Sequence, residues 1–197
     1  SPNPKGLMEY ISTCKREFKP QTKFQYSCLN YITLQHIIET ITGQSLRDFA
    51  KENIFDILGM QYTDYLPTIQ QQDGKWINTV ACPWMDRIAP TEKQKDGSVL
   101  CGQVHDPLAR ILNGGISGNA GIFSNANDIG ILAAALLNGG EYNGRRILSP
   151  LGVKTMCTVP RELTAFGRTP GWDIFSPYAS NKGDLFSPNT FGHTGYT

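Results

Sequence analysis

Apolar residues recur with helical spacing in two neighbouring stretches of the first third of the chain. Between residues 31 and 42 they stand mostly three or four positions apart, which predicts a helix with one buried stripe. The stripe consists of Ile32, Leu34, Ile37, Ile38 and Ile41. Gly43 stands where many helices end in a left-handed glycine. Ser45 predicts the start of a second helix, because its hydroxyl can accept the N–H of Asp48, and this helix ends near residues 58–60.

Further periodic segments lie in the second half of the chain. A strongly apolar run predicts a helix over residues 127–137 that stops at Gly139. Ser149 followed by Pro150 predicts another short helix, since serine caps helices well and proline suits the first turn. From Thr164 onward, aromatic and β-branched residues stand among glycines and prolines, which predicts short strands.

Three stretches have no such periodicity. Residues 1–23 are polar and interrupted by prolines, so no helix is predicted there. Residues 61–110 contain many turn-forming residues and are predicted to be rich in loops, and a long irregular region of this kind often forms a binding face. Residues 114–121 are dense in glycine and are predicted to form a tight turn before the helix at 127–137.

The composition is that of an ordinary globular protein. The chain has 197 residues, of which 40% are hydrophobic and 18% charged, and this length predicts one domain. Its 18 basic and 17 acidic side chains give a formal net charge of +1, too small to attract nucleic acid or an anionic membrane. The best apolar run, residues 129–137, is half of the roughly 18 residues that a membrane span needs. We expect no nucleic-acid partner and no transmembrane segment in this chain.

The five cysteines leave the redox compartment open. An odd number means that at least one is unpaired within the chain, and their spacing resembles neither a zinc site nor a small disulfide scaffold. Cys82 and Cys101 flank one polar loop and could pair in an oxidising compartment. The favoured interpretation is that all five are free thiols that pack as small hydrophobic residues.

His105 and Asp106 form the only motif that suggests a metal site. Adjacent histidine and aspartate occur in metal-dependent phosphohydrolases, but those enzymes need several further ligands, and this chain has three histidines in all. We therefore predict no metal, and expect the pair to hold its loop in place by hydrogen bonds.

Two serines match fragments of nucleophile motifs. Ser117 lies in the glycine-dense segment, but a G-x-S-x-G elbow would need glycine at position 119, where Asn119 stands. Ser12 and Lys15 fit S-x-x-K, which on a helix places a serine beside the lysine that removes its proton. The surroundings of that motif are strongly polar, whereas a nucleophile helix is expected to be buried, so both matches are interpreted as coincidences.

Two segments of the chain resemble known motifs. Residues 24–34 read F-Q-Y-S-C-L-N-Y-I-T-L, and residues 191–197 read F-G-H-T-G-Y-T. The first resembles the segment F-x-Y-S-N/D-x-N-Y-x-x-L, which is the second motif of the serine β-lactamase-like hydrolases, and the other resembles their last motif, K-T-G or H-T-G. This family includes class C β-lactamases, low-molecular-weight penicillin-binding proteins and related esterases. Between the two motifs, the segments similar to the family are residues 37–39, 42–45, 54–60, 88–92, 102–106 and 114–124, in the family's order.

The resemblance implies a role for each matching residue. Tyr26 would be the catalytic tyrosine that carries a proton between nucleophile and leaving group, and His193 would take the catalytic cationic position of the last motif. The backbone N–H of Tyr196 would form half of the oxyanion hole. The positions implied to bind substrate are Cys28, Asn30, Thr194, Gly195 and Tyr196.

The chain also departs from the family pattern. Cys28 replaces the usual asparagine or aspartate of the second motif. The family's S-x-x-K precedes the tyrosine by many tens of residues, so Ser12 and Lys15 stand too close to Tyr26 to be that motif. We therefore expect residues 1–197 to be a partial domain that lacks the N-terminal nucleophile part and the C-terminal strands.

The implied fold is mixed α/β (α+β), β-lactamase/transpeptidase-like, with an antiparallel sheet and helices. This chain would hold mainly the helical, loop-rich region and part of the sheet.

The implied reaction is acyl-enzyme hydrolysis of an amide or ester (a β-lactam, a D-alanyl peptide or a carboxylic ester) without metal or organic cofactor. The substrate would be a small molecule or peptide, and the location the periplasm or cell envelope of a bacterium. The alternative is a catalytically inactive penicillin-binding-protein-like module that binds peptidoglycan-type peptides. The oligomeric state stays open.

Overall fold

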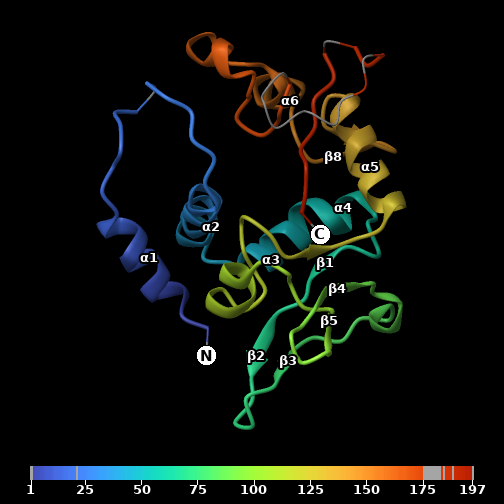
Figure 1. Ribbon diagram of the computed structural model, residues 1–197. Helices are drawn as coiled ribbons and strands as arrows, with labels where there is room; N and C mark the ends of the chain where they lie inside the picture. The colour runs from blue at the N-terminus through green and yellow to red at the C-terminus, as the bar shows by residue number, and fades with distance from the viewer. Residues whose placement is uncertain (1, 21, 175–182, 184, 188, 197) are drawn as a thin grey trace. The chain divides into compact units, whose positions relative to one another are not determined.

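The computed structural model describes residues 2–20, 22–174, 183, 185–187 and 189–196. Figure 1 shows the chain coloured from its N-terminus to its C-terminus. Its contacts divide the chain into two units. The first unit consists of Ser1–Lys15 and Tyr26–Ile131, and the second of Arg16–Gln25 and Leu132–Thr197. Each unit is described by itself.

Two helices predicted from the sequence pattern are present in the first unit. Helix α2 spans Cys28–Thr42 and ends at Gly43, whose φ of 70° is left-handed, as predicted. Ser45 Oγ accepts the N–H of Asp48 at 3.1 Å and so caps the next helix, which is also confirmed. That helix runs on through three consecutive segments: α3 (Leu46–Ala50), the π-helical segment η1 (Lys51–Phe55) and α4 (Asp56–Leu58).

Helix α1, Pro4–Thr13, contradicts the expectation that residues 1–23 form no helix. Asn3 precedes it, and its side-chain oxygen accepts the N–H of Gly6 at 2.9 Å. Pro4 occupies the first helical position, where the missing N–H costs nothing. The prolines that suggested an irregular segment therefore mark a helix start.

The expected buried stripe of α2 is confirmed only in part. Ile32 is buried at 3% exposure, but Leu34 is 50% and Ile41 78% exposed. The second buried residue of the helix is the polar Gln35. Its amide binds a distant backbone segment, so the buried face of α2 contains Ile32 and Gln35 rather than the whole apolar stripe.

The loop-rich region contains strands too short to be recognised from sequence. They form antiparallel two-stranded sheets, β1 with β6, β2 with β3, and β4 with β5. Their bounds are Asp64–Tyr65 (β1), Thr68–Gln70 (β2), Trp76–Asn78 (β3), Pro90–Lys93 (β4), Val99–Cys101 (β5) and Ile122–Phe123 (β6). Strands of two to four residues show no measurable alternation of apolar and polar positions. Two further short helical segments lie here, η2 (Met85–Arg87) and the π-helical η3 (Leu108–Leu112).

Helix α5 spans Ala126–Leu137 and α6 spans Pro150–Cys157, and both confirm the pattern. Ser149 Oγ accepts the N–H of Gly152 at 3.0 Å, which is the expected cap. Between them lies a short antiparallel pair, β7 (Glu141–Tyr142) and β8 (Arg145–Arg146).

The tail differs in part from the expected short strands. It opens with the 3₁₀-helix η4, Arg161–Phe166, and the described residues after it form two isolated antiparallel bridges, Arg168 with Asp173 and Asp173 with Gly192. Residues 175–182 of the expected strand region lie outside the described residues.

Candidate functional site

The second-motif residues meet at the start of α2. Tyr26 is exposed and stands directly before Ser27, whose Oγ caps the helix by accepting the N–H of Leu29 at 3.2 Å. Cys28 is the first helical residue and is half-buried, and Asn30 is exposed. Residues two positions apart in a helix are separated by about 200° around its axis, so Asn30 projects from a different face than Cys28. The asparagine cannot take the place of the amide that Cys28 lacks.

The last-motif residues follow an antiparallel bridge. The N–H of Asp173 donates to the Gly192 carbonyl at 2.8 Å, and the N–H of Gly192 donates back at 3.0 Å. His193 follows, exposed, with Nδ1 2.6 Å from the Thr194 carbonyl oxygen. In the tautomer in which Nδ1 donates to that carbonyl, Nε2 is an acceptor. Gly195 and Tyr196 continue the chain and are exposed.

The predicted site residues therefore form two groups. Tyr26, Cys28 and Asn30 belong to the first unit, and the segment His193–Tyr196 belongs to the second. Within each group the residues are neighbours. The catalytic and substrate-binding roles of both groups stay predictions.

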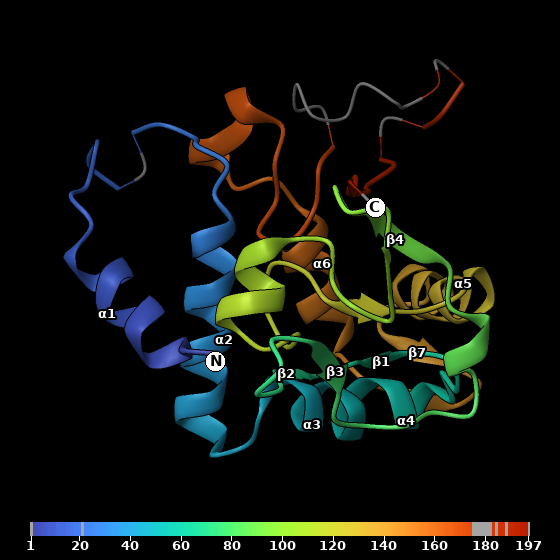
Figure 2. The ribbon, with the colours of Figure 1, turned by 60° about the horizontal axis from the view of Figure 1, so that its bottom comes forward.

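A buried glutamine joins the glycine-dense segment to α2. This glutamine was not predicted from the sequence, where its one signal was a polar side chain among apolar neighbours. Gln35 Oε1 accepts the N–H of Gly118 at 3.0 Å, and its Nε2 donates to the Ile116 carbonyl at 3.1 Å. Glycine is needed at 118, because a Cβ there would lie 2.1 Å from the Tyr31 carbonyl oxygen. In Figures 1 and 2 the yellow-green chain that leads into this segment lies beside α2. The segment thus supports the helix that begins just after Tyr26.

Ser117 is part of this support. Its side chain is almost fully buried, at 1% exposure. Its hydroxyl accepts from Asn113 Nδ2 at 2.8 Å and donates to Asn119 Oδ1 at 2.7 Å. Both partners are neutral amides, whereas a serine nucleophile needs a neighbouring base. Ser117 is therefore a structural residue, in agreement with its interpretation from sequence.

Ser12 and Lys15 do not form a nucleophile pair in this structure. Ser12 is exposed, and its hydroxyl donates to the Glu9 carbonyl at 2.7 Å. Helix α1 ends at Thr13, so Lys15 lies beyond the helix, and the shared helical face that S-x-x-K requires is not formed.

His105 and Asp106 hold a loop together. Asp106 Oδ1 accepts the N–H of Ala109 at 2.8 Å and so caps η3. Glu92 lies between a histidine and an arginine, with its carboxylate oxygens 3.8 Å from His105 Nε2 and 3.7 Å from Arg110 Nη1. Among the described residues, no group of three or more His, Cys, Asp or Glu side chains could hold a metal ion.

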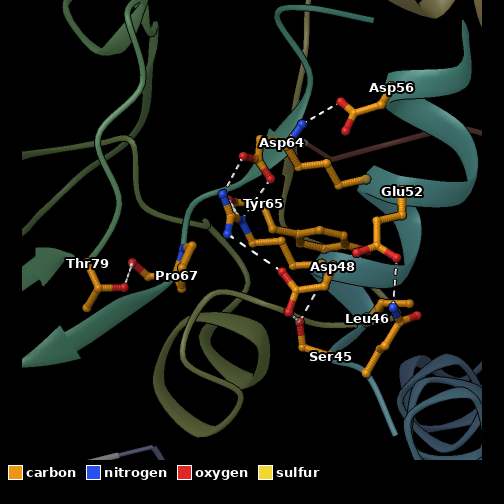
Figure 3. A network of polar contacts seen from close by, with 12 residues as sticks. Ser45, Leu46, Asp48, Glu52, Asp56, Asp64, Tyr65, Pro67 and Thr79 are labelled. Atoms are coloured by element: carbon orange, nitrogen blue, oxygen red, sulfur yellow. Dashed lines mark hydrogen bonds and ion pairs between the residues drawn. The ribbon is translucent and has the colours of Figure 1, made fainter. Parts of the chain in front are cut away.

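A forked ion pair joins α3 to strand β1. Arg47 Nε and Nη2 donate to the two carboxylate oxygens of Asp64 at 2.9 and 2.7 Å, and Nε also reaches the Tyr65 carbonyl at 3.2 Å. Figure 3 shows Asp64 and Tyr65 on the strand facing Ser45 and Asp48 at the helix start. The hydrogen bonds from Arg47 to Asp64 raise the pKa of the Arg47 guanidinium. Burial raises the pKa of the Tyr65 phenol, with a smaller effect of the Glu39 charge.

All five cysteines are free thiols, so the alternative Cys82–Cys101 disulfide is not formed. Cys101 Sγ lies 3.1 Å from the Ile88 carbonyl oxygen. Burial raises the pKa of the Cys82 thiol.

Comparison with known proteins agrees with the motif succession. The Beta-lactamase family matches residues 1–197. An Escherichia coli (strain K12) protein named "Putative D-alanyl-D-alanine carboxypeptidase" is 34% identical over 204 residues, which cover 96% of this chain and 44% of that protein. The chain therefore spans less than half the length of this curated relative.

Solved structures resemble the chain in fold. The D-stereospecific amidohydrolase from Streptomyces sp. is 17% identical with a TM-score of 0.57, and the match covers 88% of this chain and 46% of that one. The D-amino acid amidase from Ochrobactrum anthropi SV3, in complex with L-phenylalanine, is 19% identical with a TM-score of 0.54, covering 80% and 39%. These similarities confirm the predicted mixed fold of helices and short antiparallel sheets. No helix among the described residues has the length and apolar character to cross a membrane.

Proposed function

The chain belongs to the beta-lactamase family, and on this basis we propose that it is part of a serine hydrolase that removes a C-terminal D-alanine from a peptide through an acyl-enzyme. The observation that carries this proposal is the 34% identity to the Escherichia coli relative over 96% of the chain. The name of that relative supports D-alanyl peptides as the proposed substrate class.

In the proposed reaction, a serine hydroxyl attacks the carbonyl of the scissile amide, D-alanine leaves with a proton, and water then releases the shortened peptide. Tyr26 would move the proton between the serine and the leaving amine. His193 would orient the substrate carboxylate, and the backbone N–H of Tyr196 would stabilise the oxyanion. No metal or organic cofactor takes part in these steps.

We propose that the nucleophile lies in an S-x-x-K motif outside residues 1–197, which would make this chain a partial domain. Two observations support this. Ser117 and Ser12 are held by structural hydrogen bonds. The chain also matches only 44% of the length of its Escherichia coli relative.

A second candidate is a catalytically inactive module of the same family that binds peptidoglycan-type peptides. The observation in its favour is Cys28, a half-buried thiol at the position where the family carries an amide or carboxylate. In both cases we propose a bacterial cell-envelope location, because a peptidoglycan-type substrate is found there, and a peptide or small-molecule ligand.

The test uses the full-length protein with a fluorescent penicillin and a peptide that ends in D-alanyl-D-alanine. We expect covalent labelling of one serine, located by mass spectrometry, and release of D-alanine. Tyr26→Phe should lower D-alanine release by about a hundredfold or more, as expected for loss of an acid–base group. The matched control is Tyr10→Phe on α1, an exposed tyrosine outside the motifs. Reversible peptide binding without labelling or release would establish the binding module instead.

A further inference from the structure

A hairpin in the second unit brings two oppositely charged side chains together. Within residues 167–174 the N–H of Thr169 donates to the Trp172 carbonyl at 2.9 Å, which closes a tight turn. Arg168 and Asp173 face each other across this turn as an antiparallel bridge. Their side chains form an ion pair, with Arg168 Nε 2.9 Å from Asp173 Oδ1.

This ion pair is the most buried one in the described part of the chain. The side chain of Arg168 is 8% and that of Asp173 4% exposed. By contrast, the Arg146–Glu141 pair of the same unit is 42% exposed on both sides. A buried charge is costly unless its partner is present, so each member of the buried pair fixes the position of the other.

Asp173 extends the pair toward His193. Its backbone makes both hydrogen bonds of the bridge to Gly192, the residue directly before the histidine. The neighbouring side chains reinforce this contact, because the rings of Trp172 and Phe191 lie 5.4 Å apart. The position of His193 therefore depends on where Asp173 is held.

Arg168 extends the pair toward the segment that leads to Tyr26. Its guanidinium carbon lies 5.1 Å from the centre of the Phe24 ring, a cation–π distance. The Phe24 ring also lies 6.1 Å from that of Phe166, at the end of η4. Phe24 stands two residues before Tyr26 in the chain. The guanidinium of Arg168 thus contacts Phe24, which stands before Tyr26 in the chain, and also the carboxylate of Asp173. The backbone of Asp173 in turn binds the residue before His193.

We propose that the Arg168–Asp173 ion pair is a positioning pair for the reaction, which sets the backbone before Tyr26 and before His193 without itself contacting substrate. The proposal rests on the proposed function for its effect on turnover. The claim that the ion pair holds the backbone of residues 190–196 in place is tested independently of activity.

The test compares Arg168→Lys and Asp173→Asn in the full-length protein. Lysine keeps the charge but has neither the planar fork nor the stacking face of arginine. We expect kcat for D-alanine release to fall by about tenfold to a hundredfold with a smaller change in KM, since small misplacements of catalytic groups are costly. We expect both variants to keep the folded fraction of the wild type, measured by circular dichroism, because a merely structural role would lower that fraction in proportion to kcat. The control, Arg146→Lys, should leave kcat and KM unchanged.

Hydrogen exchange provides the readout that does not depend on activity. We expect amides of residues 190–196 to exchange at least about tenfold faster in both variants, and Arg146→Lys to match the wild type. If the variants do not fold, Phe24→Leu removes the ring beneath the guanidinium and keeps the ion pair, and it should lower kcat with a smaller change in KM. Unchanged exchange in the folded variants overturns the positioning pair. Absence of D-alanine release in the wild type overturns the proposed function, while the exchange result still decides the pair.

Discussion

Gln35 Oε1 accepts a hydrogen bond from the backbone N–H of Gly118, 3.0 Å away and 83 residues later in the sequence. This contact joins the helix that follows Tyr26 to the glycine-dense segment. The same side chain also contacts Asn113, whose Nδ2 lies 3.3 Å from Gln35 Oε1. The middle of α2 is thereby held by polar contacts within the first unit.

Replacing Gln35 with leucine should destabilise the protein strongly. Leucine has a similar volume but leaves the Gly118 N–H and the Ile116 carbonyl buried without their partner, each at a cost of about 1–3 kcal/mol. We expect a loss of about 2–5 kcal/mol in the free energy of unfolding, measured by urea denaturation of the full-length protein. Gln72→Leu, an exposed glutamine of the β2–β3 turn, is the control and should change stability little.

Two glycine-to-alanine substitutions should have opposite effects. At Gly118 the new Cβ would lie 2.1 Å from the Tyr31 carbonyl oxygen, so α2 and the glycine-dense segment must separate, at a cost of about 3 kcal/mol. At Gly130 of α5 a Cβ meets nothing within 4 Å, and alanine should stabilise the helix by about 0.5–1 kcal/mol. Thermal midpoints of the two variants provide the measurement. Equal effects would show that the close backbone approach at Gly118 does not exist in solution.

Tyr65 should make the folded protein sensitive to alkaline pH. Its phenol has a raised pKa in the folded state, first through burial and then through the charge of Glu39. Above about pH 10 the unfolded chain therefore loses this proton more readily than the folded one, and stability falls as the pH rises. Below that pH the phenol is neutral in both states and has no such effect. Urea midpoints from about pH 8 to 11 should fall less steeply in Tyr65→Phe than in the wild type, whereas Tyr10→Phe should retain the wild-type slope.

Several helix ends could be predicted from sequence because each depends on a local signal. Gly43 ends α2, and Ser45 and Ser149 cap the helices that follow them, each by a hydrogen bond within a few residues. The start of α1 had an equally local signal in Asn3 and Pro4. This signal was missed because the prolines of residues 1–23 were interpreted as helix breakers.

The buried face of α2 could not be predicted, because it is decided by contacts distant in sequence. The spacing of apolar residues indicates that Leu34 and Ile41 are buried, yet both are exposed, and the buried place belongs to Gln35. Only the folded chain brings Ile116 and Gly118 to that amide. The Arg168–Asp173 pair escaped notice for a similar reason, since neither residue stands in a recognisable motif.

The motif residues themselves were accessible from sequence, whereas their roles were not. Tyr26 stands before a capped helix and His193 after an antiparallel bridge. In the proposed reaction each role depends on a serine nucleophile, and neither Ser12 nor Ser117 is held in a suitable setting. A role that needs such a partner cannot be derived from Tyr26 or His193 alone.

Cys28→Asn separates the two proposed functions. Cys28 is the first residue of α2, half-buried and two residues after Tyr26. Asparagine would return an amide donor and acceptor to the position where a thiol offers only weak hydrogen bonds. If the protein is a hydrolase, we expect the rate of penicillin acylation in the full-length protein to rise by about threefold to tenfold, since one added hydrogen bond contributes about 0.5–1.5 kcal/mol. The control is Cys14→Asn, which replaces an exposed thiol outside the motifs and should leave the rate unchanged.

The contrary outcome is an acylation rate of zero in both the wild type and Cys28→Asn, with peptide binding retained. That result would identify the binding module, because restoring the amide cannot restore a nucleophile that the protein lacks.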